Sequence, residues 1–126
     1  MSIENLSGLI AATFTPMDDR GALHLDMIPM IVDQLISEGV SGLYVCGGTG
    51  EGVSLTSDER KQTAEAYLRA ANSRIPVVVH VGQDSLLSAR DLAQHAADIE
   101  ADGISAITPT YFKPTSTSAL LDSLSI

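Results

Sequence analysis

The amino-acid sequence predicts an α/β fold in which helices cover a parallel sheet. Short apolar runs alternate with amphipathic helical patterns four times along the chain. Each step from one strand to the next takes roughly thirty residues, the length of a βαβ unit. The runs are apolar on both faces, which is typical of parallel strands buried between layers. We expect strands at 8–15, 41–45, 76–81 and 104–107.

Four helices follow these strands. The first is expected over 25–37, where apolar residues recur at helical spacing and Gly39 closes the helix. The second is expected over 57–72, since Thr56 and Glu59 have the spacing of a capping box. The third is expected over 85–101 with Gly103 as its stop, and the fourth begins near Ser116.

Two architectures share this pattern. An open, doubly wound sheet carries helices on both of its faces. A (β/α)₈ barrel carries them all outside but typically needs about 250 residues, whereas this chain has 126. Half a barrel would also expose the edges of its outer strands, which favours aggregation. The composition and the regular alternation of strands and helices leave both architectures open.

Composition excludes several classes of function. The formal net charge of −9 is opposite to the basic footprint of a nucleic-acid-binding protein. No apolar run approaches the roughly 20 residues of a membrane span, and no signal-peptide pattern is present. The single cysteine, Cys46, excludes an internal disulfide and fits a reducing compartment. We therefore expect one domain of a cytoplasmic protein, with no nucleic acid and no membrane among its partners.

The stretch with most chemical information is the glycine-rich loop that follows the second strand, residues 47–52. Val53 stands where a dinucleotide fingerprint needs glycine and a phosphate loop needs lysine, so neither nucleotide motif is met. Glycine permits positive φ and close approach to a ligand, and successive amides can point at an anion. With the hydroxyl of Thr49, the loop predicts a cradle for a small carboxylate. The alternative is a tight turn without a ligand.

Other reactive side chains favour structural interpretations. Cys46 has no basic partner nearby in the sequence, so a small buried hydrophobe is expected. His80 ends the third strand without a second ligand at metal spacing, so a structural histidine is expected and no metal is predicted. Lys61 and Lys113 are the only lysines, and neither is an obvious buried amine with a depressed pKa.

Four spaced motifs carry a resemblance to a known family. They are Gly8-Leu-Ile-Ala-Ala-Thr-Phe-Thr-Pro-Met17, Gly47-Gly-Thr-Gly-Glu51, Ser57-Asp-Glu-Arg60 and Thr108-Pro-Thr-Tyr111. In this order, over essentially the whole chain, they resemble the N-acetylneuraminate lyase/dihydrodipicolinate synthase family. The segments His80-Val-Gly82, Ala93-Gln-His-Ala-Ala97 and Lys113-Pro114 are more similar to sialic acid lyases than to the synthases.

The resemblance implies a (β/α)₈ barrel, usually a homotetramer, acting as a class I aldolase without metal or organic cofactor. In such enzymes pyruvate forms a Schiff base with a lysine on the sixth strand. The resemblance places Gly48 and Thr49 at the positions that bind the pyruvate carboxylate. Tyr111 matches a catalytic tyrosine that, in the synthases, reaches into a neighbouring subunit's site.

Two departures from the family pattern matter. Gly48 stands where the family usually has Ser or Thr, so one of two adjacent hydroxyls is missing. The chain also ends before the strands that carry the family's catalytic tyrosine and Schiff-base lysine. We therefore interpret residues 1–126 as the N-terminal half of the barrel, the first four βα units, truncated within the fourth helix.

The leading hypothesis is thus an N-acetylneuraminate lyase-like aldolase when full length, cleaving a 2-keto acid to pyruvate and an aldehyde, with this chain alone inactive. One alternative is a dihydrodipicolinate synthase-like condensation of pyruvate with an aldehyde. The other is a catalytically silent half barrel that serves as a binding or interaction module.

Overall fold

Four parallel strands form one sheet in the order β1-β2-β3-β4. The computed structural model describes residues 6–125. The strands are β1 (Ile10–Ala12), β2 (Gly42–Val45), β3 (Val77–His80) and β4 (Gly103–Ser105). Each pairs in parallel with the next, Tyr44 lying beside Ala12 on one side and Val78 on the other. All four carboxyl ends therefore lie at the same end of the sheet.

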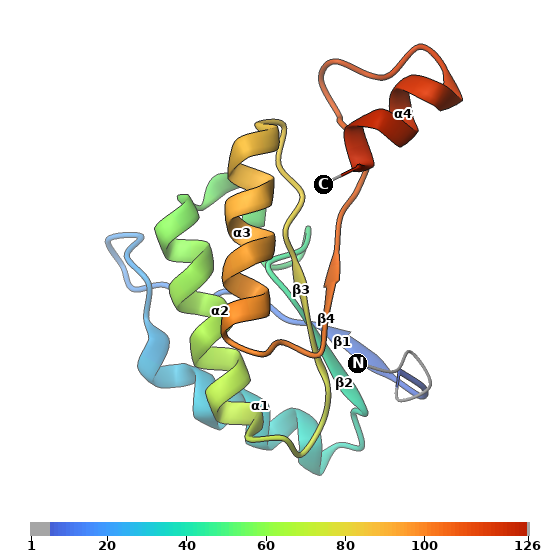
Figure 1. Ribbon diagram of the computed structural model, residues 1–126. Coiled ribbons are helices and arrows are strands. Elements are labelled where there is room, and N and C mark those ends of the chain that lie inside the picture. The colour runs from blue at the N-terminus through green and yellow to red at the C-terminus, as the bar shows by residue number, and fades with distance from the viewer. Residues whose placement is uncertain (1–5, 126) are drawn as a thin grey trace.

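The helices that connect these strands form a single layer. The chain contains η2 (Leu25–Met27), α1 (Ile28–Ser37), η3 (Gly52–Ser54), α2 (Ser57–Ala71), α3 (Leu86–Asp98) and α4 (Thr117–Leu124). Helices α1, α2 and α3 stand on one face of the sheet, α2 packing between the other two (Figure 1). Sequential strand order with right-handed crossovers puts every helix on the same side, whereas a doubly wound sheet reverses its order. The fold is that of the first βα units of a barrel.

The hydrophobic core lies between the sheet and this helical layer. Alternate residues of β2 and β3 point into it, and Leu43, Val45 and Val77 are fully buried. The helices contribute Ile28, Val32, Tyr67, Leu92 and Ala96, among others. Truncating one such aliphatic side chain to alanine costs about 2–5 kcal/mol in a packed core.

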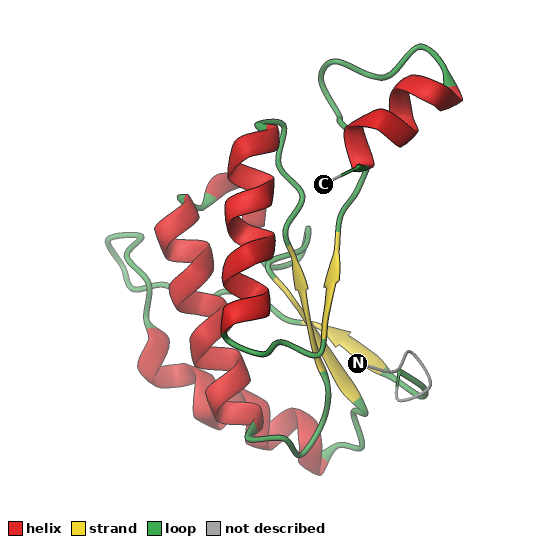
Figure 2. Ribbon diagram, viewed as in Figure 1, coloured by secondary structure: helices red, strands yellow, loops and turns green. Residues whose placement is uncertain are grey.

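The other face of the sheet is only partly covered. Tyr44 and Val78 are half-buried there and Ala12 is exposed. Helix α4 stands beyond the carboxyl end of β4, apart from α1, α2 and α3, as Figure 2 also shows. At the open edges Leu9 is 65% exposed and Ile104 is 53% exposed. The two edge strands thus leave apolar surface uncovered.

The elements were predicted in the right order, with some bounds wrong. The first strand ends at Ala12 rather than residue 15. Beyond Ala12, Thr13 Oγ1 still donates to the Tyr44 carbonyl of β2, whereas Thr15 Oγ1 donates to the Gly50 carbonyl in the loop after β2. The third helix ends at Asp98 rather than residue 101, since Glu100 has a left-handed φ of 59°. Gly103 therefore does not stop a helix but opens β4. No helix among residues 6–125 is long and apolar enough to cross a membrane.

Candidate functional site

The loop between β2 and α2 turns sharply at both ends, and glycine is not the residue that turns. Cys46 has φ 61° and Glu51 has φ 56°, both in the left-handed region. The loop's glycines are absent from the positive-φ positions of residues 6–125, so the expectation that they supply positive φ was wrong. The loop is closed by two amides, Gly52 N donating to the Gly47 carbonyl at 3.1 Å and Glu51 N to that of Gly48 at 3.0 Å.

The glycines are needed instead for close approach. A Cβ on Gly52 would overlap the carbonyl oxygen of Cys46, and one on Gly47 would overlap the ring of Tyr44. A Cβ on Gly50 would lie 3.1 Å from the Thr13 carbonyl oxygen. Gly48 differs from these three, because a Cβ there would meet nothing within 4 Å. The position that departs from the family pattern is thus the one with room for a side chain.

The segment after β1 holds this loop in place through hydrogen bonds. Thr15 Oγ1 donates to the Gly50 carbonyl at 2.7 Å, and Thr13 N donates to the Tyr44 carbonyl at 3.0 Å. Between them, the Phe14 carbonyl accepts from the hydroxyl of Tyr67 at 2.5 Å. Burial raises the pKa of Tyr67 to about 12, so this hydroxyl stays a donor at neutral pH. Sequence reasoning missed these anchors, although Thr13 and Thr15 belong to a motif it had singled out.

The tip of the loop keeps free donors. Gly48 and Thr49 are exposed, in contrast to the buried residues on either side of them. Within residues 6–125, the amides of Gly48 and Thr49 donate to no backbone carbonyl. The loop tip at the carboxyl end of the sheet therefore offers three hydrogen-bond donors, the amides of Gly48 and Thr49 and the Thr49 hydroxyl. Such a group of donors can bind a small anion.

A polar row lies next to the loop on the sheet face that the helices leave uncovered. The Tyr44 hydroxyl and the Ser105 hydroxyl are 3.0 Å apart, joining β2 to β4 across β3. The ring of His80 lies 6.2 Å from that of Tyr44, centroid to centroid, and His80 pairs in register with Ser105. Sequence reasoning did not single out Tyr44 or Ser105. The signal that could have found them is the alternation of side chains between the two faces of the sheet along each strand.

His80 is buried and hydrogen-bonded, as expected of a structural histidine. Its Nδ1 lies 3.2 Å from Nη2 of Arg60, so Nδ1 accepts and the proton resides on Nε2. Burial, and secondarily the positive charge of Arg60, lower the pKa of His80. The imidazole is therefore neutral at neutral pH.

Cys46 also has the expected structural role. It is 1% exposed, and its thiol donates to the Arg60 carbonyl with Sγ 3.8 Å from the oxygen. Burial raises the pKa of Cys46 to about 11, against an opposing effect of the Arg60 charge. A thiol with so high a pKa is not a nucleophile at neutral pH.

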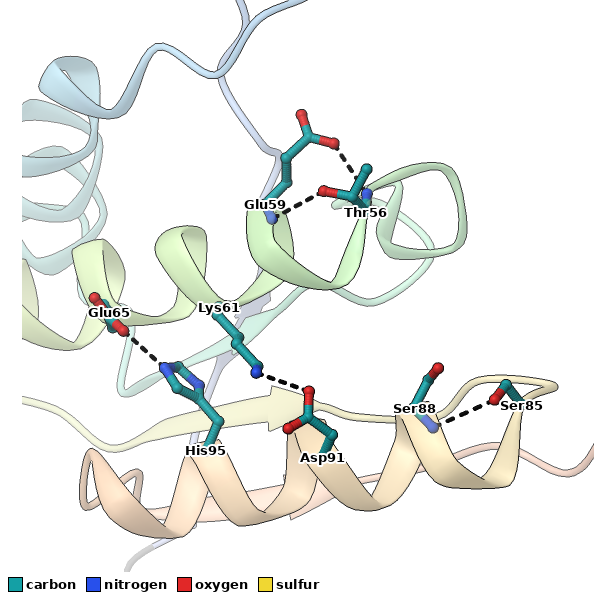
Figure 3. A network of polar contacts seen from close by, with 8 residues as sticks. All are labelled: Thr56, Glu59, Lys61, Glu65, Ser85, Ser88, Asp91 and His95. Atoms are coloured by element: carbon teal, nitrogen blue, oxygen red, sulfur yellow. Dashed lines mark hydrogen bonds and ion pairs between the residues drawn. The ribbon is translucent and has the colours of Figure 1, made fainter.

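The two lysines occupy peripheral positions. Lys61 Nζ forms an ion pair with Asp91 at 2.7 Å between α2 and α3, and hydrogen bonding to that carboxylate raises its pKa (Figure 3). Lys113 is exposed in the segment that leads to α4. A Schiff-base lysine needs the opposite change, a depressed pKa.

Figure 3 also shows how α2 begins. The predicted capping box is present: Glu59 N donates to Thr56 Oγ1 at 3.1 Å, and Thr56 N donates to Glu59 Oε1 at 2.9 Å. Such a box contributes typically about 1 kcal/mol to helix stability. It fixes where the glycine-rich loop ends and the helix starts.

No hydrogen bond joins Tyr111 to the Gly48–Thr49 tip among residues 6–125. It is 80% exposed in the segment between β4 and α4. Its ring lies edge-to-face against that of its neighbour Phe112, with centroids 4.8 Å apart. Gly48 and Thr49 thus stand together at the loop tip, while Tyr111 is exposed on a different segment of the chain.

Comparison with known proteins assigns this arrangement to a family. The sequence profile described as "Dihydrodipicolinate synthetase family" matches residues 5–121. A curated N-acetylneuraminate lyase from Danio rerio is 47% identical over 120 residues, which are 94% of this chain and 39% of that protein. The N-acetylneuraminate lyase from Rattus norvegicus is 45% identical over 96% of this chain and 38% of its own length.

Solved structures show a similarity to the same family. The Proteus mirabilis N-acetylneuraminate lyase superimposes with a TM-score of 0.91 at 37% identity, covering 94% of this chain and 40% of that one. A dihydrodipicolinic acid synthase family protein from E. coli K12, in complex with pyruvate, gives 0.90 at 32% identity with the same coverage. The chain therefore spans well under half the length of these relatives. Sequence profile and fold together show that this chain belongs to the dihydrodipicolinate synthetase family.

Proposed function

We propose that this chain supplies the carboxylate-binding part of a class I aldolase that cleaves a 2-keto acid to pyruvate and an aldehyde. The observation that carries the proposal is the loop tip, where Gly48 and Thr49 are exposed and their amides donate to no backbone carbonyl within residues 6–125. The tip lies at the carboxyl end of the strands, where barrel enzymes carry their active sites.

A lyase is favoured over a synthase. The similar curated relatives are N-acetylneuraminate lyases, at 43–47% identity for the first six. We therefore propose N-acetylneuraminate, or a related 2-keto acid sugar, as the substrate and pyruvate as the product retained at the loop. No metal or organic cofactor is needed, because a lysine imine acts as the electron sink.

The proposal requires groups beyond residue 126. We use "complete barrel" for this chain together with the remaining βα units of the family fold. There a catalytic tyrosine on the fifth strand and the Schiff-base lysine on the sixth would face the loop tip, as the family resemblance implies. In this chain, the raised pKa of Lys61 argues against that amine as the nucleophile.

Tyr111 is proposed as a catalytic residue that acts across a subunit interface of a homotetramer. Its support is its exposure of 80% and the absence of any side-chain hydrogen bond to its hydroxyl among residues 6–125. A phenol on such an exposed segment can enter the site of a neighbouring copy.

The test is to incubate the complete barrel with N-acetylneuraminate and to measure pyruvate release by a coupled lactate dehydrogenase assay. Borohydride trapping in the presence of pyruvate should give a single covalent adduct on a lysine outside this chain. If neither pyruvate release nor trapping occurs, the aldolase proposal is wrong. Release of pyruvate without a trappable adduct would contradict the imine mechanism alone.

A further inference from the structure

Arg60 is a buried cation on the first turn of α2. The residue is 2% exposed, although arginine is rarely buried without a charged partner. Its Nη1 donates to the Gly82 carbonyl at 3.0 Å and its Nη2 to the His80 carbonyl at 2.6 Å. Arg60 thus joins the helix that follows the glycine-rich loop to the carboxyl end of β3.

No carboxylate neutralises this guanidinium within the part of the chain that the structure describes. The ion pairs there are Lys61–Asp91, Arg74–Asp33 and His95–Glu65. The partners of Arg60 are two carbonyls and a neutral imidazole nitrogen, which accept hydrogen bonds but carry no charge. Its Nε has no partner at all among the described residues. Since the chain has 16 acidic residues, the missing counter-charge does not reflect a shortage of carboxylates.

The uncompensated charge of Arg60 lies near Cys46, the residue that precedes the glycine-rich loop. The Cys46 thiol donates to the backbone of Arg60, and Cys46 directly precedes Gly47. The guanidinium is also close enough to Cys46 to favour its ionised form electrostatically. A buried positive charge is poorly screened by salt and acts over several ångströms.

We infer that Arg60 is a positioning residue that supplies the positive field for the substrate carboxylate at the Gly48–Thr49 tip without touching it. The inference rests on the proposed function. The amides and the Thr49 hydroxyl make the contacts, while Arg60 supplies the counter-charge and holds the ends of β2 and β3 together. Its field discriminates a charged carboxylate from an uncharged ester of the same shape.

The experiment compares pyruvate with methyl pyruvate as ligands of the complete barrel. The readout is the concentration of each compound that gives half-maximal borohydride trapping. In Arg60→Gln the value for pyruvate should rise about tenfold, while that for methyl pyruvate should change less than twofold. Arg69→Gln is the matched control, because Arg69 is an exposed arginine on the same helix, and it should change neither value.

A purely structural role predicts a different result. If Arg60→Gln raises both values equally, or neither, the inference is wrong. Should Arg60→Gln fail to fold, Arg60→Lys decides. It keeps the charge but loses the forked hydrogen bonds, so the wild-type preference for pyruvate over methyl pyruvate should persist even at a lower melting temperature, and loss of that preference overturns the inference. A wild-type barrel that traps neither compound instead contradicts the proposed function.

Discussion

Thr15 and Gly50 are 35 positions apart in the sequence, yet the Thr15 hydroxyl donates to the Gly50 carbonyl at 2.7 Å in a buried contact. This bond ties the chain after β1 to the loop after β2. It holds the loop in place from a neighbouring strand rather than from within the loop. The rigidity of the candidate site therefore depends on residues that contact no ligand.

Thr15→Val should remove that bond and leave the Gly50 carbonyl buried without a partner. We expect the free energy of unfolding of the complete barrel to fall by about 1–3 kcal/mol, measured by urea denaturation. Thr115→Val is the control, because Thr115 is exposed, and it should be nearly neutral. Equal stability of the two variants would contradict the bracing role.

Thr49→Ala should weaken pyruvate binding without loss of stability. Removing one hydrogen bond to a charged group costs about 1.5–3 kcal/mol, or roughly tenfold to a hundredfold in affinity. Thr49 is exposed at the loop tip, so the melting temperature of the complete barrel should stay nearly unchanged. Normal pyruvate binding by a destabilised Thr49→Ala protein would instead mark the loop as a structural turn.

Two substitutions in the same loop should have opposite outcomes. Gly48→Ser should be tolerated, because a Cβ there meets nothing within 4 Å, and the added hydroxyl restores the family pair. Gly52→Ala should destabilise the protein strongly, because its Cβ would overlap the Cys46 carbonyl. The melting temperatures of both variants test this contrast. The rate of pyruvate release from N-acetylneuraminate tests whether the restored hydroxyl raises activity. Similar melting temperatures would show that the loop backbone adapts freely.

His80 should make the stability of the complete barrel depend on pH. Burial and the Arg60 charge lower its folded-state pKa below the unfolded value of about 6.5. As the pH falls below about 6.5, the unfolded chain binds a proton that the folded chain does not, so the free energy of unfolding decreases. Urea midpoints between about pH 7.5 and about pH 5.5 should therefore fall less in His80→Gln than in the wild type. His24→Gln is the control, because His24 is exposed, and its urea midpoint should fall over this pH range as much as that of the wild type.

The 126-residue chain by itself should form no imine with pyruvate. Lys61 is held by Asp91 with a raised pKa, and Lys113 is exposed on the segment before α4. Borohydride treatment with pyruvate should leave the intact mass of this chain unchanged. A stable adduct on either lysine, located by peptide mass spectrometry, would refute the assignment of the nucleophile to the rest of the barrel.

The sequence alone determined the order and type of the elements. Apolar runs at 41–45 and 76–81 and the capping box at Thr56 are local signals, and β2, β3 and the start of α2 lie where these signals put them. The motifs in register also identified the family, since four matched segments constrain a fold far more than one glycine loop. The structural interpretations of Cys46 and His80 followed from the lack of local partners, and the structure agrees with both.

Tertiary structure decided what local patterns leave open. The strand order β1-β2-β3-β4 chose the barrel-like layer over a doubly wound sheet, and strand order is a long-range property that periodicity does not encode. The contacts of Thr15 with Gly50 and of Arg60 with His80 join residues 35 and 20 positions apart. Left-handed turns fell on Cys46 and Glu51, leaving the glycines to make room for neighbouring backbone and rings. Close packing set those choices, because a Cβ at Gly52 or Gly47 has no space once the strands are paired.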